Sequence, residues 1–502
     1  MGNPLFDRLF GRHIGKTSTF LILPDGSRLS HGRFLKLAAR YAHALAELGL
    51  KTGDRVALQV EKSPNALAVY AACAQSGLVF LPLNTAYTAH EVDYFVSNSG
   101  AGLLIGDPEK AGNLSDVASR YGAKFLTMDE SGNGSLAAKA AGKPEEFETV
   151  ERSQDDLAAI LYTSGTTGRS KGAMLSQRNL LSNAEVLCSE WRFDENDVLL
   201  HALPIFHTHG LFVGTNISLL AGGAMIFLPK LDVDALIKWM PTATTMMGVP
   251  TFYTRLLGDA RFTKELTKTM RLFVSGSAPL LAETHRRFFD RTGHKILERY
   301  GMTETNMNTS NPYDGERRPG TVGLPLPGVE VKVCDSEGND LPRGEIGTLE
   351  VRGENVFQGY WQMPEKTREE LRENGFFITG DLAQQSEDGY VTIVGRAKDL
   401  VISGGFNIYP KEVEEALDTQ EGVLESAVIG VPHPDLGEAT VGIIVARSGA
   451  TPDLDSIQLN LGNRLARFKQ PRKLILIDAL PRNTMGKVQK AALRETYKDL
   501  FA

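Results

Sequence analysis

The chain has 502 residues, of which 42% are hydrophobic and 23% charged, with 50 glycines and 23 prolines. This composition is typical of a globular protein, and the length exceeds what one hydrophobic core usually supports, so we expect two or three structural units. The formal net charge of −7 gives no positive field for nucleic acid or a membrane surface, so neither is expected as a partner. An anionic substrate must then be held by local cations.

The three cysteines, Cys73, Cys188 and Cys334, lie far apart. Their spacing excludes a disulfide scaffold or a thiolate zinc site and suits a reducing compartment. No apolar stretch is long enough to predict a membrane span, and the start MGNPLF lacks the features of a signal peptide or a myristoylation signal. We therefore expect a cytoplasmic protein.

Strands and helices are predicted to alternate over residues 1–320. Apolar residues recur at helical spacing over 34–48, before Gly49, and residues 56–60 and 79–83 form apolar runs typical of strands. Between those runs, Ser63 and Pro64 predict the start of a helix that ends near Gly77. Strand, helix and strand in this order indicate a doubly wound α/β region. The alternation continues through 157–161, 198–203 and 272–274.

The pattern changes after about residue 320. Short β-branched runs alternate with glycine-rich turns over 321–397, which predicts a small β-rich subdomain completing a large N-terminal domain of residues 1–397. Runs at 411–417, 427–429, 441–445, 457–465 and 474–477 predict a compact α+β domain over 398–502. The linker is placed at 395–399.

The segment 162–172, YTSGTTGRSKG, has the composition of a phosphate-binding loop. Its glycines let the backbone approach a ligand, its hydroxyl and N–H groups can surround phosphate oxygens, and Lys171 adds a positive charge. A flexible polar loop is the alternative, and the density of these residues disfavours it. Because glycine follows Lys171, the segment is not a P-loop of the NTPase type.

This segment resembles the phosphate loop of the adenylate-forming superfamily, which includes acyl-CoA synthetases, non-ribosomal peptide adenylation domains and firefly luciferase. Further segments match that superfamily in order, at 298–304 (ERYGMTE), 379–381 (TGD), 395–399 (GRAKD), 403–407 (SGGFN) and 481–487 (PRNTMGK). They cover nearly the whole chain. The resemblance implies ATP, Mg²⁺ and coenzyme A as co-substrates and cofactor, and a mobile C-terminal domain.

The resemblance also implies roles for single residues. Joining a carboxylate to the α-phosphate of ATP brings two anions together, so positive charge and orientation are needed. Thr303 is expected to contact the α-phosphate, Thr163 and Glu304 to hold Mg²⁺, and Lys487 to bridge the two anions as the catalytic lysine. Tyr300 would stack on adenine, Asp381 would bind the ribose hydroxyls, and Arg396 would reach the ribose or phosphates. The full set predicted to bind ATP or AMP is Thr163, Ser164, Gly165, Thr166, Thr167, Gly168, Lys171, Ser277, Ala278, Glu298, Arg299, Tyr300, Gly301, Met302, Thr303, Asp381, Arg396 and Lys487.

In this superfamily the C-terminal domain rotates between two half-reactions. The matching hinge is Lys398, and the loop predicted to line the CoA tunnel is Ser403, Gly404, Gly405 and Phe406. A basic stretch, residues 464–473, either meets the CoA phosphates or is a solvated face. Acetylation of Lys487 by a lysine acetyltransferase is a further hypothesis, since it would remove the charge needed for adenylation.

The acid is suggested by the combination of four segments, which is similar to that of malonyl-CoA synthetases. They are 204–212 (PIFHTHGLF), 248–256 (GVPTFYTRL), 274–280 (VSGSAPL) and 297–315 (LERYGMTETNMNTSNPYDG). Malonate keeps a second carboxylate, whose burial requires a cation and hydrogen-bond donors. The resemblance predicts Arg255 as that cation, with His207, Ser275, Ser277 and Met302 lining the pocket and His207 also counted as catalytic. Methylmalonate is expected to be used too, because one methyl group changes selectivity only about 10–200-fold.

Other functions remain open at this point. The acid could be acetate, oxalate or a medium-chain acid, although Arg255 disfavours the last. A luciferase-like use of the adenylate, a non-enzymatic regulator and a carrier-protein loading module are the alternatives from other classes. CoA is the simpler acceptor, because the sequence continues for only a short distance after Lys487.

Overall fold

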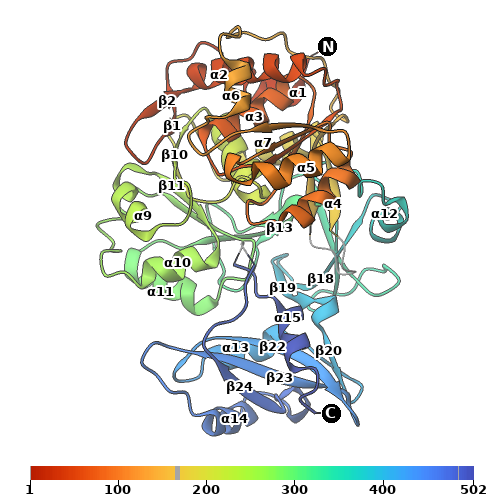
Figure 1. Ribbon diagram of the computed structural model, residues 1–502. Helices are drawn as coiled ribbons and strands as arrows, with labels where there is room; N and C mark the ends of the chain where they lie inside the picture. Colours follow the sequence, from red (N-terminus) through yellow and green to blue (C-terminus); the bar gives the residue numbers. More distant parts are fainter. Residues whose placement is uncertain (1, 164–169, 484–485, 502) are drawn as a thin grey trace.

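The computed structural model describes residues 2–163, 170–483 and 486–501. The predicted phosphate-loop residues Ser164, Gly165, Thr166, Thr167 and Gly168 lie outside this part of the chain. Figure 1 shows a large N-terminal domain above a small C-terminal domain, connected through the segment that follows β19. The α/β fold class predicted from the sequence is confirmed.

A mixed sheet forms the centre of the large domain. Its strand order is β15-β14-β13-β12-β11-β9-β10-β1-β2, with a parallel run from β13 to β1 and antiparallel strands at both ends. The strands are β1 (Thr19–Ile22), β2 (Arg28–Ser30), β9 (Val198–His201), β10 (Ala224–Phe227), β11 (Thr245–Gly248), β12 (Leu272–Ser275), β13 (Leu297–Met302), β14 (Asn306–Ser310) and β15 (Leu324–Pro325).

A second sheet has the order β6-β5-β3-β4-β7-β8 and is parallel except for the last pair. It contains β3 (Arg55–Gln59), β4 (Val79–Pro82), β5 (Leu103–Gly106), β6 (Lys124–Thr127), β7 (Leu157–Thr163) and β8 (Lys171–Ser176). The parallel pairing of β3 with β4, joined by one helix, is the unit predicted from residues 56–83.

Helices cover these two sheets (Figure 1). They are α1 (Pro4–Leu9), α2 (His31–Glu47), α3 (Pro64–Gln75), α4 (Ala89–Ser99), α5 (Ala111–Arg120), α6 (Ser135–Ala140), α7 (Gln177–Glu190), α8 (Asn216–Ala221), α9 (Val233–Trp239), α10 (Pro250–Leu257) and α11 (Ala282–Thr292). The start of α3 is as predicted, because the Ser63 side chain accepts a hydrogen bond from the Ala66 N–H. No helix in the described part of the chain is long and apolar enough to cross a membrane.

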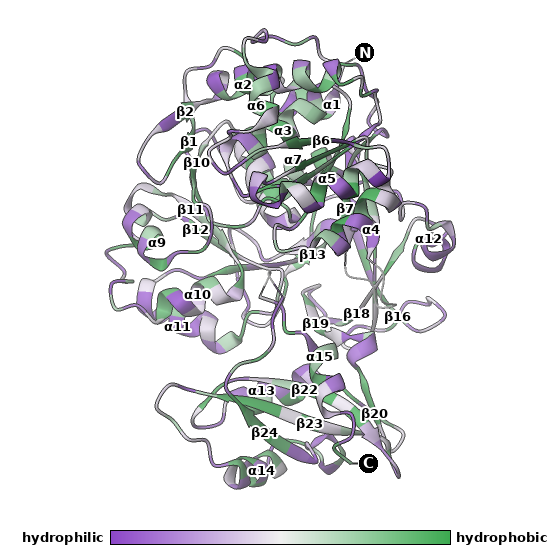
Figure 2. Cartoon of the chain, in the orientation of Figure 1, coloured by the Kyte–Doolittle hydropathy of each residue, from purple (hydrophilic) through white to green (hydrophobic). Residues whose placement is uncertain are grey.

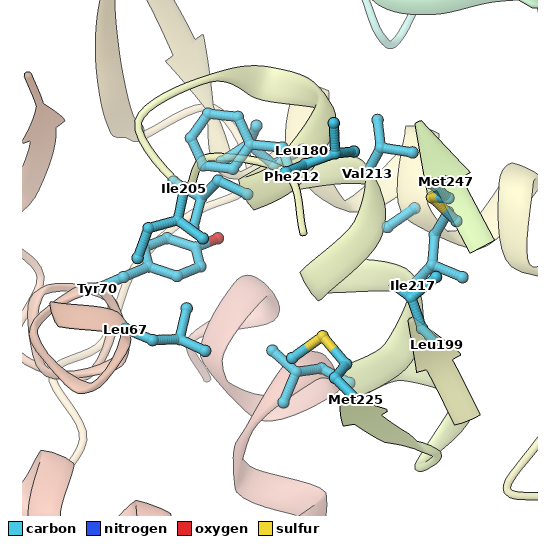
Figure 3. Close-up of a cluster of buried hydrophobic side chains, with 14 of the residues drawn as sticks. Leu67, Tyr70, Leu180, Leu199, Ile205, Phe212, Val213, Ile217, Met225 and Met247 are labelled. Carbon is cyan, nitrogen blue, oxygen red and sulfur yellow. The ribbon is translucent and has the colours of Figure 1, made fainter. Parts of the chain in front are cut away.

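The largest apolar core joins the helices to the central sheet. Figure 3 shows Leu67 and Tyr70 of α3 facing the region of Phe212 and Ile217, with Met225 of β10 nearby. All of these side chains are buried, and each buried apolar side chain of this size contributes about 1.5–3 kcal/mol to folding. The cluster fixes the segment after β9, which leads into the candidate site.

An antiparallel four-stranded sheet follows, in the order β16-β17-β18-β19. Its strands are β16 (Val329–Cys334), β17 (Gly347–Gly353), β18 (Phe377–Gln385) and β19 (Val391–Arg396), and α12 (Pro364–Glu370) precedes β18. This sheet corresponds to the β-rich region predicted after residue 320.

The C-terminal domain is built on a separate five-stranded sheet, in which β24 pairs with β23 beside the order β21-β20-β23-β22. Its elements are β20 (Val401–Ser403), β21 (Phe406–Ile408), α13 (Pro410–Asp418), β22 (Val423–His433), β23 (Gly437–Ala446), α14 (Leu454–Gly462), β24 (Lys473–Ile477) and α15 (Lys490–Tyr497). Its strands include long hydrophobic stretches (Figure 2), and two separate apolar clusters form around them. Helix α14 begins earlier than predicted because the Asp453 side chain caps it by accepting from the N–H groups of Asp455 and Ser456.

Candidate active site

Hydrogen bonds between side chains connect the three sheets of the large domain at one place. Tyr300 of β13 contacts Asp381 of β18, and Thr163 at the end of β7 contacts Glu304 after β13. Residues predicted from distant segments therefore meet beside the carboxyl ends of β7 and β13, and α/β sheets usually form ligand sites at such ends.

Asp381 is held as an acceptor by two neighbouring side chains, Arg396 and Tyr300. It is 3% exposed, and its Oδ1 lies 2.7 Å from Nε of Arg396, its pairing partner across β18 and β19. The Tyr300 hydroxyl donates to the other carboxylate oxygen. Burial and the Asp381 charge raise the pKa of Tyr300, so its hydroxyl stays protonated and keeps donating. Asp381, Tyr300 and Arg396 thus form one preorganised group.

A second group of contacts surrounds Glu304. The Thr163 hydroxyl donates to Glu304 Oε1 over 3.4 Å, and the Tyr360 hydroxyl lies 3.0 Å from the same oxygen. Tyr360 also lies 2.6 Å from Glu370, which pairs with Lys171 at 3.0 Å. Lys171 is therefore held by a carboxylate beside the predicted metal ligands.

The oxygens of Thr163 and Glu304 are hard ligands of the kind that Mg²⁺ prefers. Among the described residues there is no cluster of three or more acidic, histidine or cysteine side chains that could hold a metal ion alone. Such a sparse donor set fits an ion that is bound mainly by phosphate oxygens and water.

The loop after β12 presents Ser277 and Ala278, both half-buried. Ser277 has a φ of 68°, an uncommon conformation for a residue other than glycine and one often found at functional sites. Glu298 lies beneath this loop and accepts from the Leu280 N–H at 3.1 Å. Burial raises the pKa of Glu298 to about 7, against the opposing influence of Lys411. Glu298 thus supports the loop from below.

Met302 and Thr303, both half-buried, follow directly in the hairpin between β13 and β14. Gly301 permits this turn, because a Cβ there would lie 1.9 Å from the Asn306 carbonyl oxygen. No larger residue fits at this position.

Several polar side chains are buried in the predicted acid pocket. His207 and His209 flank the start of a π-helical segment, His209–Thr215, a rare geometry that often marks functional sites. Burial, followed by the charge of Arg299, lowers the pKa of His207 to about 4 and that of His209 well below its usual value. Both rings are therefore neutral at pH 7. Ser275 is fully buried, and the Ser277 hydroxyl lies 3.3 Å from His209 Nδ1.

Lys487 of the C-terminal domain reaches the same site. Its side chain is exposed to solvent, yet the surrounding protein atoms lower its pKa, with Arg396 and Lys398 adding to the effect and Asp381 opposing it. Its charge in turn contributes to the lowered pKa of His207. Lys487, Asp381 and His207 are thus close enough to interact electrostatically.

Arg255 does not belong to this buried group. It is exposed on α10 and lines a cavity of about 490 Å³ between the domains, together with residues such as Lys62, Lys230 and Arg482. Gly486 of the C-terminal domain lines the same cavity, beside Thr251.

The predicted CoA-tunnel residues occupy the β20–β21 hairpin of the C-terminal domain. Gly404 and Gly405 form its turn with φ values of 57° and 84°, a conformation that requires glycine. Phe406 is 55% exposed and its ring stacks on Phe468 at 4.7 Å. Lys398 lies in the short helix Ala397–Asp399 between the domains, where burial lowers its pKa.

Sequence analysis missed Tyr360 and Glu370, which complete the Lys171–Glu304 group. Neither lies in a segment of the superfamily pattern, and nothing in the local spacing brings them to β8. They reach β8 through a tertiary contact between that strand and the segment after β17. In this contact the Met174 N–H donates to the Gly359 carbonyl.

Comparison with known proteins places this geometry in a family. Residues 10–361 match the AMP-binding enzyme family and residues 412–487 match its C-terminal domain. The chain belongs to the AMP-binding enzymes.

Solved structures and curated proteins give closer relatives. ATP-bound MatB from Rhodopseudomonas palustris is 56% identical over the full length of both chains, with a TM-score of 0.98. Malonate–CoA ligase of Arabidopsis thaliana is 32% identical, over 99% of this chain and 89% of the relative. Feruloyl-CoA synthase of an Amycolatopsis species is 35% identical, over 94% of each.

The same MatB without ligand gives a TM-score of 0.86 at the same identity. The overall structure is therefore more similar to ATP-bound MatB than to MatB without ligand.

Glu298 generates a pH prediction. Its pKa of about 7 in the folded protein exceeds the ordinary value of 4.5, so the folded state binds more protons than the unfolded state between these values and stability falls as pH rises. Glu298→Gln removes the titrating carboxyl group and with it this contribution to the pH dependence of stability. It keeps a side-chain oxygen that can accept from the Leu280 N–H. We expect the melting temperature of the variant, relative to the wild type, to rise from about pH 4.5 to about pH 7. Glu195→Gln, at an exposed position, is the control, and a pH-independent difference for Glu298→Gln would contradict the interpretation.

Tyr360 generates a second prediction. Tyr360→Phe removes the hydroxyl that contacts both Glu304 and Glu370, and a hydrogen bond to a charged group is worth about 1.5–3 kcal/mol. We expect the Mg²⁺ concentration for half-maximal activity to rise about tenfold or more. Tyr390→Phe loses a hydroxyl bond to the Glu316 carbonyl elsewhere and should not change the Mg²⁺ dependence. Equal Mg²⁺ dependence in both variants would rule out this role.

Proposed function

We propose that the protein ligates malonate to coenzyme A through a malonyl-adenylate, consuming ATP and releasing AMP and pyrophosphate. The observation that chiefly supports this is the position of Lys487 beside Asp381, Arg396 and His207, in a chain 56% identical over its full length to ATP-bound MatB. Methylmalonate is a second substrate in this proposal, since a single methyl group is weakly discriminated.

In the first half-reaction the residues of the nucleotide group orient ATP. Asp381 accepts from the ribose hydroxyls, Tyr300 packs against the adenine, and the loop with Ser277 and Ala278 covers its other side. Thr303 and Arg396 contact the phosphates. Positive charge from Lys487 offsets the repulsion between carboxylate and α-phosphate.

Thr163 and Glu304 would hold Mg²⁺, which neutralises charge on the phosphates when it is bound. The chain's own contribution is to fix Glu304, whose Oε1 receives hydrogen bonds at 3.4 Å from Thr163 and 3.0 Å from Tyr360. Lys171 stays close by through Glu370 and is available to the phosphate loop.

In the second half-reaction the C-terminal domain rotates about Lys398. This rotation removes Lys487 from the active site and brings the Ser403–Phe406 turn to it. Contacts that hold the present arrangement in the described part of the chain include polar ones, which suits such a motion. Lys411 donates to the Ile393 carbonyl at 2.8 Å, and Arg447 pairs with Glu283 at 3.3 Å. Partly exposed ion pairs of this kind stabilise a contact by about 0–1 kcal/mol each.

The substrate assignment is tested with the purified protein, ATP, Mg²⁺ and CoA. We expect AMP and pyrophosphate to form faster with malonate and methylmalonate than with acetate, succinate, octanoate and ferulate. Mass spectrometry should then detect the CoA thioester of malonate or methylmalonate. The reason is that the buried pocket side chains are polar, whereas octanoate and ferulate require apolar walls. Preference for acetate, octanoate or ferulate would overturn the assignment of malonate.

Lys487→Ala separates the two half-reactions. We expect malonate-dependent exchange of pyrophosphate into ATP to fall by about 10²–10³-fold or more, because one preorganised charge is lost from the transition state. Thioester formation from synthetic malonyl-adenylate and CoA should persist. Lys498→Ala, at an exposed site paired with Glu495, is the control. Equal loss of both steps would contradict domain alternation.

We also propose that acetylation of Lys487 by a lysine acetyltransferase would have the same effect as Lys487→Ala, namely loss of adenylation with thioester formation retained. The exposure of its side chain is compatible with modification.

A further inference from the structure

Arg482 joins the segment that carries Lys487 to the sheet of the C-terminal domain. This Lys487 segment is the chain between β24 and α15. Nη1 of Arg482 donates to the Gly486 carbonyl at 2.5 Å, and Nη2 forms an ion pair with Glu425 of β22. The Gly486 carbonyl belongs to the peptide bond directly before Lys487. One guanidinium therefore connects the backbone at the lysine to a strand of the sheet.

The Lys487 segment extends from its own domain toward the large domain (Figure 1). Gly486 lies near α10, because a Cβ on Gly486 would be 3.5 Å from the Thr251 hydroxyl oxygen. Asn483 and Lys487 are exposed, and the Asn483 N–H donates to the Lys487 carbonyl at 2.9 Å. A loop that leaves the body of its domain is held less by packing than by its bonds back to that domain. The two contacts of Arg482 therefore bear directly on where Lys487 lies.

The sheet offers an acidic group to which this segment is attached on both sides. Burial and the charges of Glu414 and Glu425 raise the pKa of Asp418 to about 7, which shows that these carboxyl groups lie close together. Lys490 pairs with Glu414 at 2.6 Å, in the same way as Arg482 pairs with Glu425. In both pairs the side chains are 28% exposed or less, so water screens them less than surface pairs. The residues before and after the catalytic lysine are thus both held.

The direction of Lys487 matters because its charge stabilises a transition state only if it is placed in advance. A displacement of about 1 Å in such a site can lower a rate by about 10²-fold. Arginine suits the task of fixing the backbone here, since its planar guanidinium presents donors in fixed directions and can hold two groups at once. A lysine at position 482 has a single nitrogen on a flexible stem and cannot reproduce this geometry.

We propose that Arg482 is a positioning residue for adenylation, which acts by joining the Gly486 carbonyl to Glu425 and so directing Lys487 toward the reacting anions. This rests on the proposed function, in which Lys487 serves the first half-reaction. All members of this Arg482 clamp (Arg482, Glu425 and Gly486) belong to the C-terminal domain, so the clamp leaves the active site together with the lysine. Arg482 therefore matters for the first half-reaction and not for the second.

Direct contact with a substrate is the alternative role, because Arg482 also lines the cavity between the domains. The two roles differ in what they change. A residue that binds the acid or CoA itself raises the KM for that substrate or slows thioester formation. A residue that only directs Lys487 lowers the kcat of adenylation and leaves both of those unchanged.

The test measures the two half-reactions separately in Arg482→Met, Arg482→Lys, Glu425→Ala and the double variant Arg482→Met with Glu425→Ala. Malonate-dependent exchange of pyrophosphate into ATP reports adenylation, and synthetic malonyl-adenylate with CoA reports thioester formation. Arg352→Met and Glu330→Ala are the matched controls, since they break an arginine–glutamate pair of 2.6 Å between β17 and β16. The melting temperature of every variant is recorded.

For Arg482→Met and for Glu425→Ala we expect the kcat of exchange to fall about 10–100-fold, because Lys487 loses its fixed direction. The KM values for ATP and malonate and the rate of thioester formation should stay at the wild-type level. The double variant should be no slower than the slower single variant, since both substitutions break the same clamp. Arg482→Lys should show a smaller loss, and Arg352→Met and Glu330→Ala should show none.

Several outcomes would overturn the inference. Equal losses in both half-reactions, or a raised KM for ATP or malonate, would give Arg482 a structural or substrate-binding role. Independent losses that multiply in the double variant would separate Arg482 from Glu425. If Arg482→Met does not fold, wild-type exchange in Arg482→Lys and Glu425→Ala would count against the clamp. A wild type that exchanges pyrophosphate with another acid but not with malonate would instead overturn the proposed function, and the clamp is then judged from exchange with that acid.

Discussion

Positive charge must be brought close to two anions without being neutralised beforehand by the protein's own carboxylates. The site meets this constraint in three ways. Arg396 is paired with Asp381 and Lys171 with Glu370, so both are positioned at the cost of part of their charge. Lys487 is brought in by the orientation of the C-terminal domain. Arg299 packs against Gly276, and its Nε and Nη2 atoms have no hydrogen-bond partner among the described residues.

The proposed mechanism gives a reason for two domains. In that mechanism, a lysine fixed permanently beside Asp381 and Arg396 would block the approach of a second substrate. Placing Lys487 on a separate domain would let its charge be present for one step and absent for the next. The polar contacts across the boundary, such as Lys411 with the Ile393 carbonyl, are weak enough to exchange. The separate apolar clusters of the C-terminal sheet allow it to move as a unit.

Much of the architecture was predictable because it is encoded locally. The start of α3 depends on Ser63 and Pro64, which are adjacent in sequence, and the parallel pairing of β3 with β4 follows from the helix between them. The nucleotide group was predictable for another reason, since each of its members lies in a recognisable segment. Tyr360 and Glu370 were not, because only long-range packing against β8 brings them to Lys171.

Arg299 shows a further limit of reasoning from segments. Residues 298–304 form one motif, yet a strand sends neighbouring side chains to opposite faces, so membership of the motif does not determine which ligand a residue meets. The neighbours of Arg299 become clear only from the tertiary structure, in which Gly276 packs against its guanidinium and its charge lowers the pKa of His207 and His209.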